Sequence, residues 1–352
     1  MNDTPAPTRS RPLIPLALVV LAACAAGLRG CGEPAPRTPP AATRAARVYE
    51  FPVFNTFAVL KLWVPPEVAD PAAQAVSARL RDLHNRINLF DPESEISRLN
   101  QTAADAPFPC SDELWALLGE CRRAWRETEG AFDVSVGPLM RLWGIHRKRE
   151  TLPTDGEIAA ALDLVGLDRI VFDDERHTVH FPRPGMYLDF GGIAKGYALQ
   201  LVLDLLRERD VSPVLVDLGG NIGGLGTPPG RDSFRIGIRN PFATGETLGT
   251  VQLRDRSIAT SGNYERQIVI QGRTIQHIVD PRTGQPVGTF AGVTVLTPRP
   301  VDSDIYSTAV FVRGEPLARK LAEQTPGTGI VLVRQGEGQP VIQTFGQIEI
   351  EP

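Results

Sequence analysis

The strand content of the second half of the chain is the feature that most restricts its fold. Seven short aliphatic, β-branched segments lie there among frequent Gly, Pro, Asp and Asn residues, as is typical of strands. They are VLVDL (214–218), FRIGI (234–238), TVQL (250–253), RQIVI (266–270), TIQHIV (274–279), GVTVL (292–296) and GIVLV (329–333). The fourth and fifth predict a hairpin around Gly272.

Helices are predicted mainly in the first half, from apolar residues at three- and four-residue spacing. One is expected to begin at Asp70-Pro71 and a second after Ser111, and a third follows Gly192. A later helix is expected over 301–312. Strand and helix do not alternate regularly, so the sequence predicts an α+β fold with antiparallel sheets and packed helices.

Length and charge limit the class of protein. The 352 residues suffice for one large domain or two smaller ones. A formal net charge of −4 argues against nucleic acid as the main partner. No segment after the N-terminus has 18 consecutive apolar residues, so no later membrane span is predicted.

The N-terminus has the layout of a bacterial secretory signal. Two arginines precede the apolar run PLIPLALVVLAAC (12–24), which ends in small residues. Leu21-Ala22-Ala23-Cys24 is similar to a lipobox, which predicts a signal peptide over 1–23 and lipidation of Cys24. The alternative is a plain signal peptide cleaved nearby.

The segment that follows, 24–47, is rich in Pro, Ala and Arg and has no hydrophobic period. It predicts a flexible tether between the membrane and a domain over 48–352. The expected location is the bacterial cell envelope, as a periplasm-facing lipoprotein on the inner or the outer membrane. Beyond the tether only Cys110 and Cys121 remain, and we expect both to be buried thiols because their spacing on a helix is too long for a disulfide.

The segment MYLDFGGIAKGYALQ (186–200) predicts a ligand site. A short strand runs into two glycines and then into a helix, with Asp189 and Lys195 on either side of the turn. The first N–H groups of a helix attract anions such as phosphates, and glycine allows a ligand to approach the backbone closely. The alternative is a tight turn with a surface ion pair.

A second chemical cluster lies at the start of the helix predicted over 301–312. Asp304, Ser307 and Thr308 share one helical face there. One carboxylate with two hydroxyls and nearby carbonyls suits Mg²⁺, which prefers oxygen ligands, whereas the alternative is a helix start with capping acids. No phosphate loop of the GxxxxGK[ST] type and no HExxH or CxxC zinc pattern occurs. His84 and His146 are expected to be structural or solvated.

Eight segments in order resemble the ApbE family of FAD:protein FMN transferases, from about Phe54 to the last strands. They are FNTF, INLFDPESEISRLN, AFDVSVGPL, LDFGGIAKGYA, VDLGGNIGGLG, SIATSGNYER, HIVDPRTGQPV and SDIYSTA. The resemblance implies a single large catalytic domain of ApbE, T-fold-like type. It also implies Mg²⁺-dependent transfer of FMN from FAD to a threonine hydroxyl of a client protein, with release of AMP.

The resemblance assigns roles to individual residues. FAD contacts are implied for Phe54, Asn55, Thr56, Phe90, Ala131, Phe132, Asp133, Asp189, Lys195 and Ile278. Mg²⁺ ligands are implied to be Asp304, Thr308, Ser307 and the carbonyl of Gly192, and His277 is the candidate base. Clients of the family carry the modified threonine near Gly-Ala-Thr, a tripeptide absent from this chain. Two alternatives are an FAD pyrophosphatase that yields FMN and AMP, and a flavin-binding lipoprotein without turnover.

Overall fold

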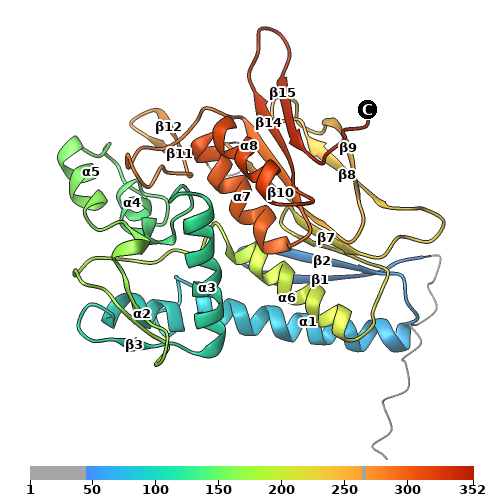
Figure 1. Ribbon diagram of the computed structural model, residues 1–352, viewed down its shortest axis with the longest axis horizontal. Helices are drawn as coiled ribbons and strands as arrows, with labels where there is room; N and C mark the ends of the chain where they lie inside the picture. The colour runs from blue at the N-terminus through green and yellow to red at the C-terminus, as the bar shows by residue number, and fades with distance from the viewer. Residues whose placement is uncertain (1–44, 264–266) are drawn as a thin grey trace, which may run out of the picture. The chain divides into compact units, whose positions relative to one another are not determined.

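The computed structural model describes residues 45–263 and 267–352 (Figure 1). The predicted signal peptide 1–23, Cys24 and all but the last three residues of the predicted tether 24–47 lie outside these ranges. None of the described helices is both long enough and apolar enough to cross a membrane.

An eight-stranded antiparallel sheet forms the centre of the fold. Its strands in spatial order are β1 (Arg47–Val53), β2 (Thr56–Leu62), β6 (Val214–Leu218), β7 (Asn221–Leu225), β10 (Ser257–Gly262), β13 (Gly292–Thr297), β14 (Gly329–Arg334) and β15 (Val341–Gly346). Every neighbouring pair is antiparallel. The structure therefore confirms the predicted α+β class with antiparallel sheets.

Helices cover one face of this sheet, as Figure 1 shows for α6 and α7. The helices of this layer are α1 (Pro66–Ile87), α6 (Ala194–Glu208), α7 (Pro300–Arg313) and α8 (Glu315–Gln324). Because side chains alternate along a strand, Val214 and Val216 of β6 pack into the core with the helices, whereas Leu215 between them faces the opposite side.

The opposite face of the sheet is covered by a separate hairpin, β8 (Phe234–Arg239) and β9 (Thr247–Leu253). Phe234 and Ile236 of this hairpin pack against Ile258, Leu296 and Val331 of the main sheet. The central strands are therefore buried on both faces, which explains why GVTVL and GIVLV are almost entirely apolar.

The remaining elements form a lobe beside the sheet. They are α2 (Glu95–Thr102), β3 (Phe108–Pro109), α3 (Asp112–Glu127), the 3₁₀ helix Val134–Val136, α4 (Gly137–Leu142), α5 (Asp155–Leu162), the 3₁₀ helix Leu167–Arg169, β4 (Val171–Asp173), β5 (Thr178–His180), β11 (Gln267–Ile270) and β12 (Arg273–Gln276). Helices α4 and α5 share a small core with the predicted hairpin β11–β12, including Trp143, Ile158 and Ile275. Trp143 Nε1 donates to Gly284 O at 2.7 Å, which ties the loop after β12 to this core.

The first predicted helix start is wrong. Helix α1 begins at Pro66, and Asp70 and Pro71 lie inside it. Pro66 occupies the first turn, where a missing N–H costs nothing, so the helix starts there. Pro71 removes one backbone hydrogen bond, but buried Ala69 and Ala72 hold the segment against the core. The other three predicted helices are confirmed, and Ser111 caps α3 by accepting from Leu114 N.

The two cysteines in the described part of the chain are free thiols. Cys121 is buried and Cys110 is partly buried. Burial raises the pKa of the Cys110 thiol to about 12, with a smaller contribution from Glu95. The prediction of unpaired thiols is therefore confirmed, whereas the prediction that both are buried is confirmed for Cys121 and wrong for Cys110.

Candidate functional site

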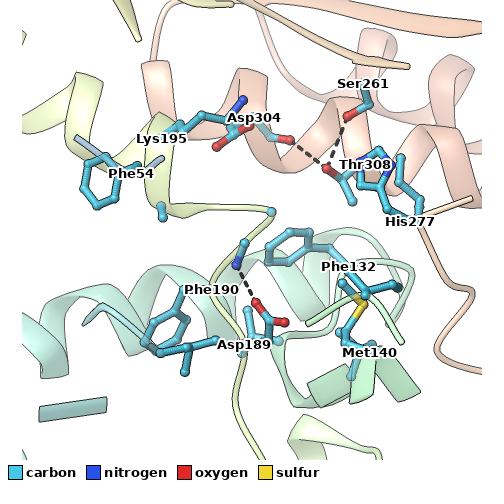
Figure 2. A pocket seen from close by; sticks show the side chains of 18 of the residues that line it. Phe54, Phe132, Met140, Asp189, Phe190, Lys195, Ser261, His277, Asp304 and Thr308 are labelled. Carbon is cyan, nitrogen blue, oxygen red and sulfur yellow. Dashed lines mark hydrogen bonds between the residues drawn. The ribbon is translucent and has the colours of Figure 1, made fainter. Parts of the chain in front are cut away.

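A cavity of about 410 Å³ collects side chains from distant parts of the sequence (Figure 2). Its walls come from the β1–β2 turn, the end of α1 and the loop after it, the segments 131–136 and 189–195, the end of β10, the segment 277–281 and α7. Every predicted site residue in the described part of the chain lines it, except Ser307. Three segments that the sequence singled out separately therefore form one site.

Asp304 is held at this cavity by the start of α6. Its Oδ2 accepts a hydrogen bond from Gly196 N at 2.7 Å. A Cβ at Gly196 would overlap Asp304 Cβ, so glycine is required for the close approach of α6 and α7. Burial raises the pKa of the Asp304 carboxyl above its usual range, and nearby Lys195 acts in the opposite direction. The site therefore presents a desolvated carboxyl near the Lys195 ammonium.

The hydroxyls of Thr308 and Ser261 extend the oxygen-rich wall beside Asp304, and they form a group with the buried Ser307. Thr308 Oγ1 lies 3.3 Å from Ser261 Oγ and donates to the carbonyl of Asp304. Ser307 Oγ donates to the same carbonyl at 2.9 Å and lies 2.9 Å from Ser261 Oγ. Ser307 is buried and does not line the cavity, whereas Ser261 does. Ser307 thus positions Ser261, which the sequence analysis missed because Ser261 belongs to β10 and not to α7.

The residues present fit the implied Mg²⁺. A Cβ at Gly192 would lie 3.6 Å from Thr308 Oγ1, so the backbone of Gly192 and the Thr308 hydroxyl are neighbours. Asp304, Thr308 and Gly192 all line the cavity and can supply an all-oxygen set with one carboxylate, as Mg²⁺ accepts when water and phosphate complete its shell. Within the described ranges, no group of three or more His, Cys, Asp or Glu side chains could hold a metal.

Ion pairs fix the start of α7 against α3. Arg123 of α3 lies 2.5 Å from the buried Asp302, and Arg299 lies 2.6 Å from Glu120. Asp302 is two residues before Asp304, so these contacts set the position of the turn that carries the carboxylate. Most of these groups are half-buried, where pairs contribute more than at the surface.

Lys195 projects from the first turn of α6 toward the same wall. Its Nζ lies 3.4 Å from Gly219 O and 3.5 Å from Asn221 Oδ1, both weak contacts that leave it able to bind an anion. Gly219 has a φ of +56°, and a Cβ there would overlap Thr56, so the turn after β6 packs directly on the turn that carries Phe54 to Thr56. The predicted anion site therefore lies between two tight turns.

Asp189 lies within hydrogen-bonding distance of His146, which was expected to be structural or solvated. Asp189 Oδ1 accepts from Gly191 N at 2.8 Å, and Asp189 Oδ2 lies 2.5 Å from His146 Nε2. Both residues line the cavity, and the ring of Phe90 contacts that of His146 edge-on at 5.9 Å. The basic segment around His146 carries no pattern that marks it as part of a site, so only the fold reveals the pairing.

The carboxylate of Asp133 accepts its hydrogen bonds from other groups of the protein. It accepts hydrogen bonds from Trp125 Nε1, Leu167 N and both the backbone N–H and the hydroxyl of Ser135, at 2.6–3.1 Å. Four donors saturate its acceptor sites. Its carboxylate thus fixes the loop that presents Ala131 and Phe132, and a contact of Asp133 with FAD stays a prediction.

An apolar side of the cavity suits a flat aromatic ring. Phe54, Phe90, Phe132 and Met140 line it. Phe54 and Asn55 have φ of +50° and +57°, which places them in the tight β1–β2 turn, and Phe54 contacts His84 edge-on at 5.4 Å. Phe90 is 63% exposed, so its ring is accessible to a ligand in the cavity.

His277 and Ile278 follow β12 and line the cavity from the lobe side. Figure 2 shows His277 on the side of Thr308 and Ser261, across from Asp189. The cavity therefore joins a carboxyl, a cation, hydroxyls and an imidazole to an apolar wall. Such a set fits binding of an aromatic nucleotide with its phosphates at the polar end.

Comparison with known proteins identifies relatives over the same segment. The ApbE family model matches residues 54–332. A protein of Haemophilus influenzae named FAD:protein FMN transferase is 32% identical over 273 residues, which cover 75% of this chain and 79% of the relative. One of the same name from Vibrio cholerae is 29% identical over 293 residues, covering 82% and 87%.

Solved structures agree with this result. The apbe protein of Thermotoga maritima aligns with a TM-score of 0.76 at 26% identity, covering 87% of this chain and 97% of that chain. The flavin transferase ApbE of Vibrio cholerae aligns with a TM-score of 0.74 at 27% identity, covering 85% and 97%.

Proposed function

The chain belongs to the ApbE family, and from that premise we propose that it transfers FMN from FAD to a client protein. The observation that carries the proposal is the single cavity in which Asp304, Lys195, Asp189 and His277 meet beside an apolar wall. This arrangement can hold a flavin dinucleotide with its pyrophosphate between the cationic and the oxygen-rich groups.

The proposed acceptor is a threonine hydroxyl of the client. Its oxygen attacks the FMN phosphorus of FAD, the bond from that phosphorus to the bridging oxygen breaks, and AMP leaves with the electron pair. His277 takes the hydroxyl proton, since an imidazole is a base of suitable strength near neutral pH. Lys195 lies where it can stabilise charge on the phosphates.

We further propose that Asp304, Thr308 and Gly192 O hold Mg²⁺. The ion, when bound, neutralises charge that develops on the phosphate oxygens. Ser261 and Ser307 keep the Thr308 hydroxyl and the Asp304 backbone in place through the contacts described above. A direct bond from Ser307 to the metal stays a prediction.

Co-expression with a candidate client carrying Gly-Ala-Thr tests the function. We expect flavin fluorescence on the client band after denaturing electrophoresis, absent when the acceptor threonine is replaced by alanine. Purified protein that releases AMP and free FMN without labelling the client would instead indicate a pyrophosphatase. Bound FAD without any product would indicate a flavin-binding protein without turnover.

We also propose that Cys24 is lipidated and anchors the domain to a membrane of the cell envelope. The support is the lipobox-like Leu21-Ala22-Ala23-Cys24 after an apolar run. Cys24→Ser should move the protein from the membrane to the soluble periplasmic fraction. Unchanged membrane retention, with no lipid mass on Cys24 of the unsubstituted chain, would exclude this anchor.

A further inference from the structure

Asn221 is a buried amide that lies behind the polar wall of the cavity. It is the first residue of β7, is 1% exposed and is not among the residues that line the cavity. Its side-chain Nδ2 is buried and has no hydrogen-bond partner among the described residues. A buried donor without an acceptor is costly, so its presence calls for an explanation. Neither the metal ligands nor the transfer step proposed above involves this side chain.

The turn between β6 and β7 fixes where this amide lies. Asn221 pairs with Leu218 across the hairpin, and the two residues between them, 219–220, are glycines with positive φ, as a two-residue hairpin turn requires. Alternate residues of a strand share a face, so Asn221 lies on the same face as Gly223. A Cβ at Gly223 would lie 2.7 Å from Leu203 Cδ1, so this face packs directly on α6. Asn221 therefore lies on the side of the sheet that α6 covers.

The Oδ1 atom of Asn221 faces the cation of the site. Lys195, in the first turn of α6, donates to Asn221 Oδ1 at 3.5 Å and to Gly219 O at 3.4 Å. These contacts are long, so they hold the ammonium near the cavity wall and still leave it able to bind an anion. The hairpin thus sets where the Lys195 ammonium lies.

The Nδ2 end of the amide lies near the carboxyl of Asp304. Burial raises the pKa of this carboxyl, and Lys195 and, to a smaller extent, the Asn221 amide lower it. A neutral amide stabilises a carboxylate by directing its N–H groups toward it. Nδ2 makes no hydrogen bond of ordinary length and angle within the described ranges, so a small movement of either side chain would complete the bond to Asp304.

Asp304 has acceptor sites to spare for this bond. Its Oδ2 already accepts from Gly196 N at 2.7 Å. A carboxylate has about four acceptor sites, so a second donor still leaves room for a cation. Lys195 and Asp304 lie on the same side of the cavity (Figure 2), and one amide between them can therefore hold both.

We propose that Asn221 is a positioning residue whose amide holds Lys195 and Asp304 at a fixed separation, so that a pyrophosphate and its Mg²⁺ bind between them. The inference rests on the FAD binding of the proposed function and names a residue behind that site. A neutral amide suits this position because it offers an acceptor to the ammonium and a donor to the carboxylate without adding a charge. The alternative is an amide that only closes the β6–β7 hairpin.

A double-mutant cycle tests the contact with Lys195. Asn221→Ala removes the amide, and Lys195→Met removes the charge and keeps an unbranched side chain. By flavin fluorescence titration in EDTA, we expect Asn221→Ala to lower FAD affinity by about tenfold in the unsubstituted chain but by less than about twofold in Lys195→Met. An amide that only closes the hairpin would change FAD affinity by the same factor in both backgrounds, and that result would overturn the proposal.

The gain in FAD affinity on adding Mg²⁺ tests the contact with Asp304. The measurement uses the His277→Ala background without client, so that FAD is not consumed. We expect the gain to fall by about fivefold or more when Asn221→Ala is added, because the carboxylate loses one of its two donors. An unchanged gain would contradict the proposal.

Two further variants control for effects on the fold. Asn221→Leu keeps the branching at Cγ and removes an unsatisfied polar group, so it should stay folded in urea titrations and still show the losses of Asn221→Ala. Thr328→Val is the matched control, because Thr328 is fully buried, its Oγ1 also has no hydrogen-bond partner in the described part of the chain, and it does not line the cavity. Thr328→Val should change neither FAD affinity nor the Mg²⁺ gain.

The outcomes separate this proposal from the function on which it rests. If the unsubstituted chain labels the Gly-Ala-Thr client but the cycle is additive and the Mg²⁺ gain is unchanged, the positioning role is overturned while the transferase stands. If both effects appear but no client is labelled, the transferase fails while the positioning role stands. If the unsubstituted chain binds no FAD, both fail.

Discussion

The backbone N–H of Gly196 donates a hydrogen bond to Asp304 Oδ2 at 2.7 Å. Gly196 lies in the first turn of α6, where backbone N–H groups have no partner within the helix. The start of one helix therefore orients the carboxylate that another helix, α7, brings to the cavity. The glycine-rich turn and the Asp304 cluster are more than 100 residues apart in the sequence. They contact each other directly and form one part of the cavity wall.

Gly196→Ala should disrupt the contact between α6 and α7 that orients Asp304. A Cβ there overlaps Asp304 Cβ and lies 3.0 Å from Pro300 O, so α6 and α7 must separate. We expect the free energy of unfolding to fall by about 1–3 kcal/mol and Mg²⁺-dependent activity to be lost. Urea unfolding and AMP release measure the two effects.

Gly119→Ala is the matched control for that substitution. Gly119 is also helical, but no atom lies within 4 Å of a Cβ placed there. Alanine in a helix interior should then stabilise the protein by about 0.5–1 kcal/mol. Equal effects of the two substitutions would show that the close approach at Gly196 is not required.

Asp189 and His146 should contribute unequally to FAD binding. Asp189→Ala removes the carboxylate that faces the cavity, and we expect FAD affinity to fall by about tenfold or more. His146→Ala should cost less, since Gly191 N still holds Asp189 Oδ1. Flavin fluorescence titration in EDTA measures both, and a larger loss for His146→Ala would reverse the assigned roles.

His277→Ala should separate transfer from binding. The imidazole acts on the attacking hydroxyl and not on the flavin, so FAD affinity should stay within a few-fold while transfer falls by roughly 10²-fold or more. Single-turnover labelling of the client with saturating FAD gives the rate. Equal losses of affinity and rate would make His277 a structural residue.

Most residues of this site can be predicted from the sequence because they occur in short local patterns. Asp304 and Thr308 share a helical face, and Asp189 and Lys195 flank one glycine turn, so short patterns reveal each pair. Both pairs line the same cavity. Contacts between a strand and a helix that are far apart in the sequence, such as Ser261 of β10 with Ser307 and Thr308 of α7, leave no local pattern and were missed.

Two further features of the structure could not be read from local patterns. His146 lies in a basic segment without a motif, and only the fold brings it to Asp189. Helix α1 starts at Pro66 and not at Asp70, because burial of Ala69 and Ala72 outweighs the bond lost at Pro71. The strands and the hairpin at Gly272 were predictable because β-branched runs and turn glycines are strong signals.

The Cys110 thiol should react slowly despite its partial exposure. Its pKa of about 12 means that only about one thiol in ten thousand is ionised at pH 8, and the thiolate is the reactive form. Alkylation by iodoacetamide at pH 8 should therefore be far slower than that of a free cysteine and should become fast on unfolding in urea. Rapid labelling of the folded protein would contradict the burial of this side chain.

The most direct test of the account is the stoichiometry of AMP and client-bound FMN in purified components. The protein, FAD, Mg²⁺ and the Gly-Ala-Thr client should yield one AMP for each FMN that stays on the client after denaturation. Both products should vanish with EDTA and with Asp304→Ala, because hydroxyls cannot replace the carboxylate for a hard divalent cation. AMP without labelled client, or near-normal labelling by Asp304→Ala in Mg²⁺, would contradict it.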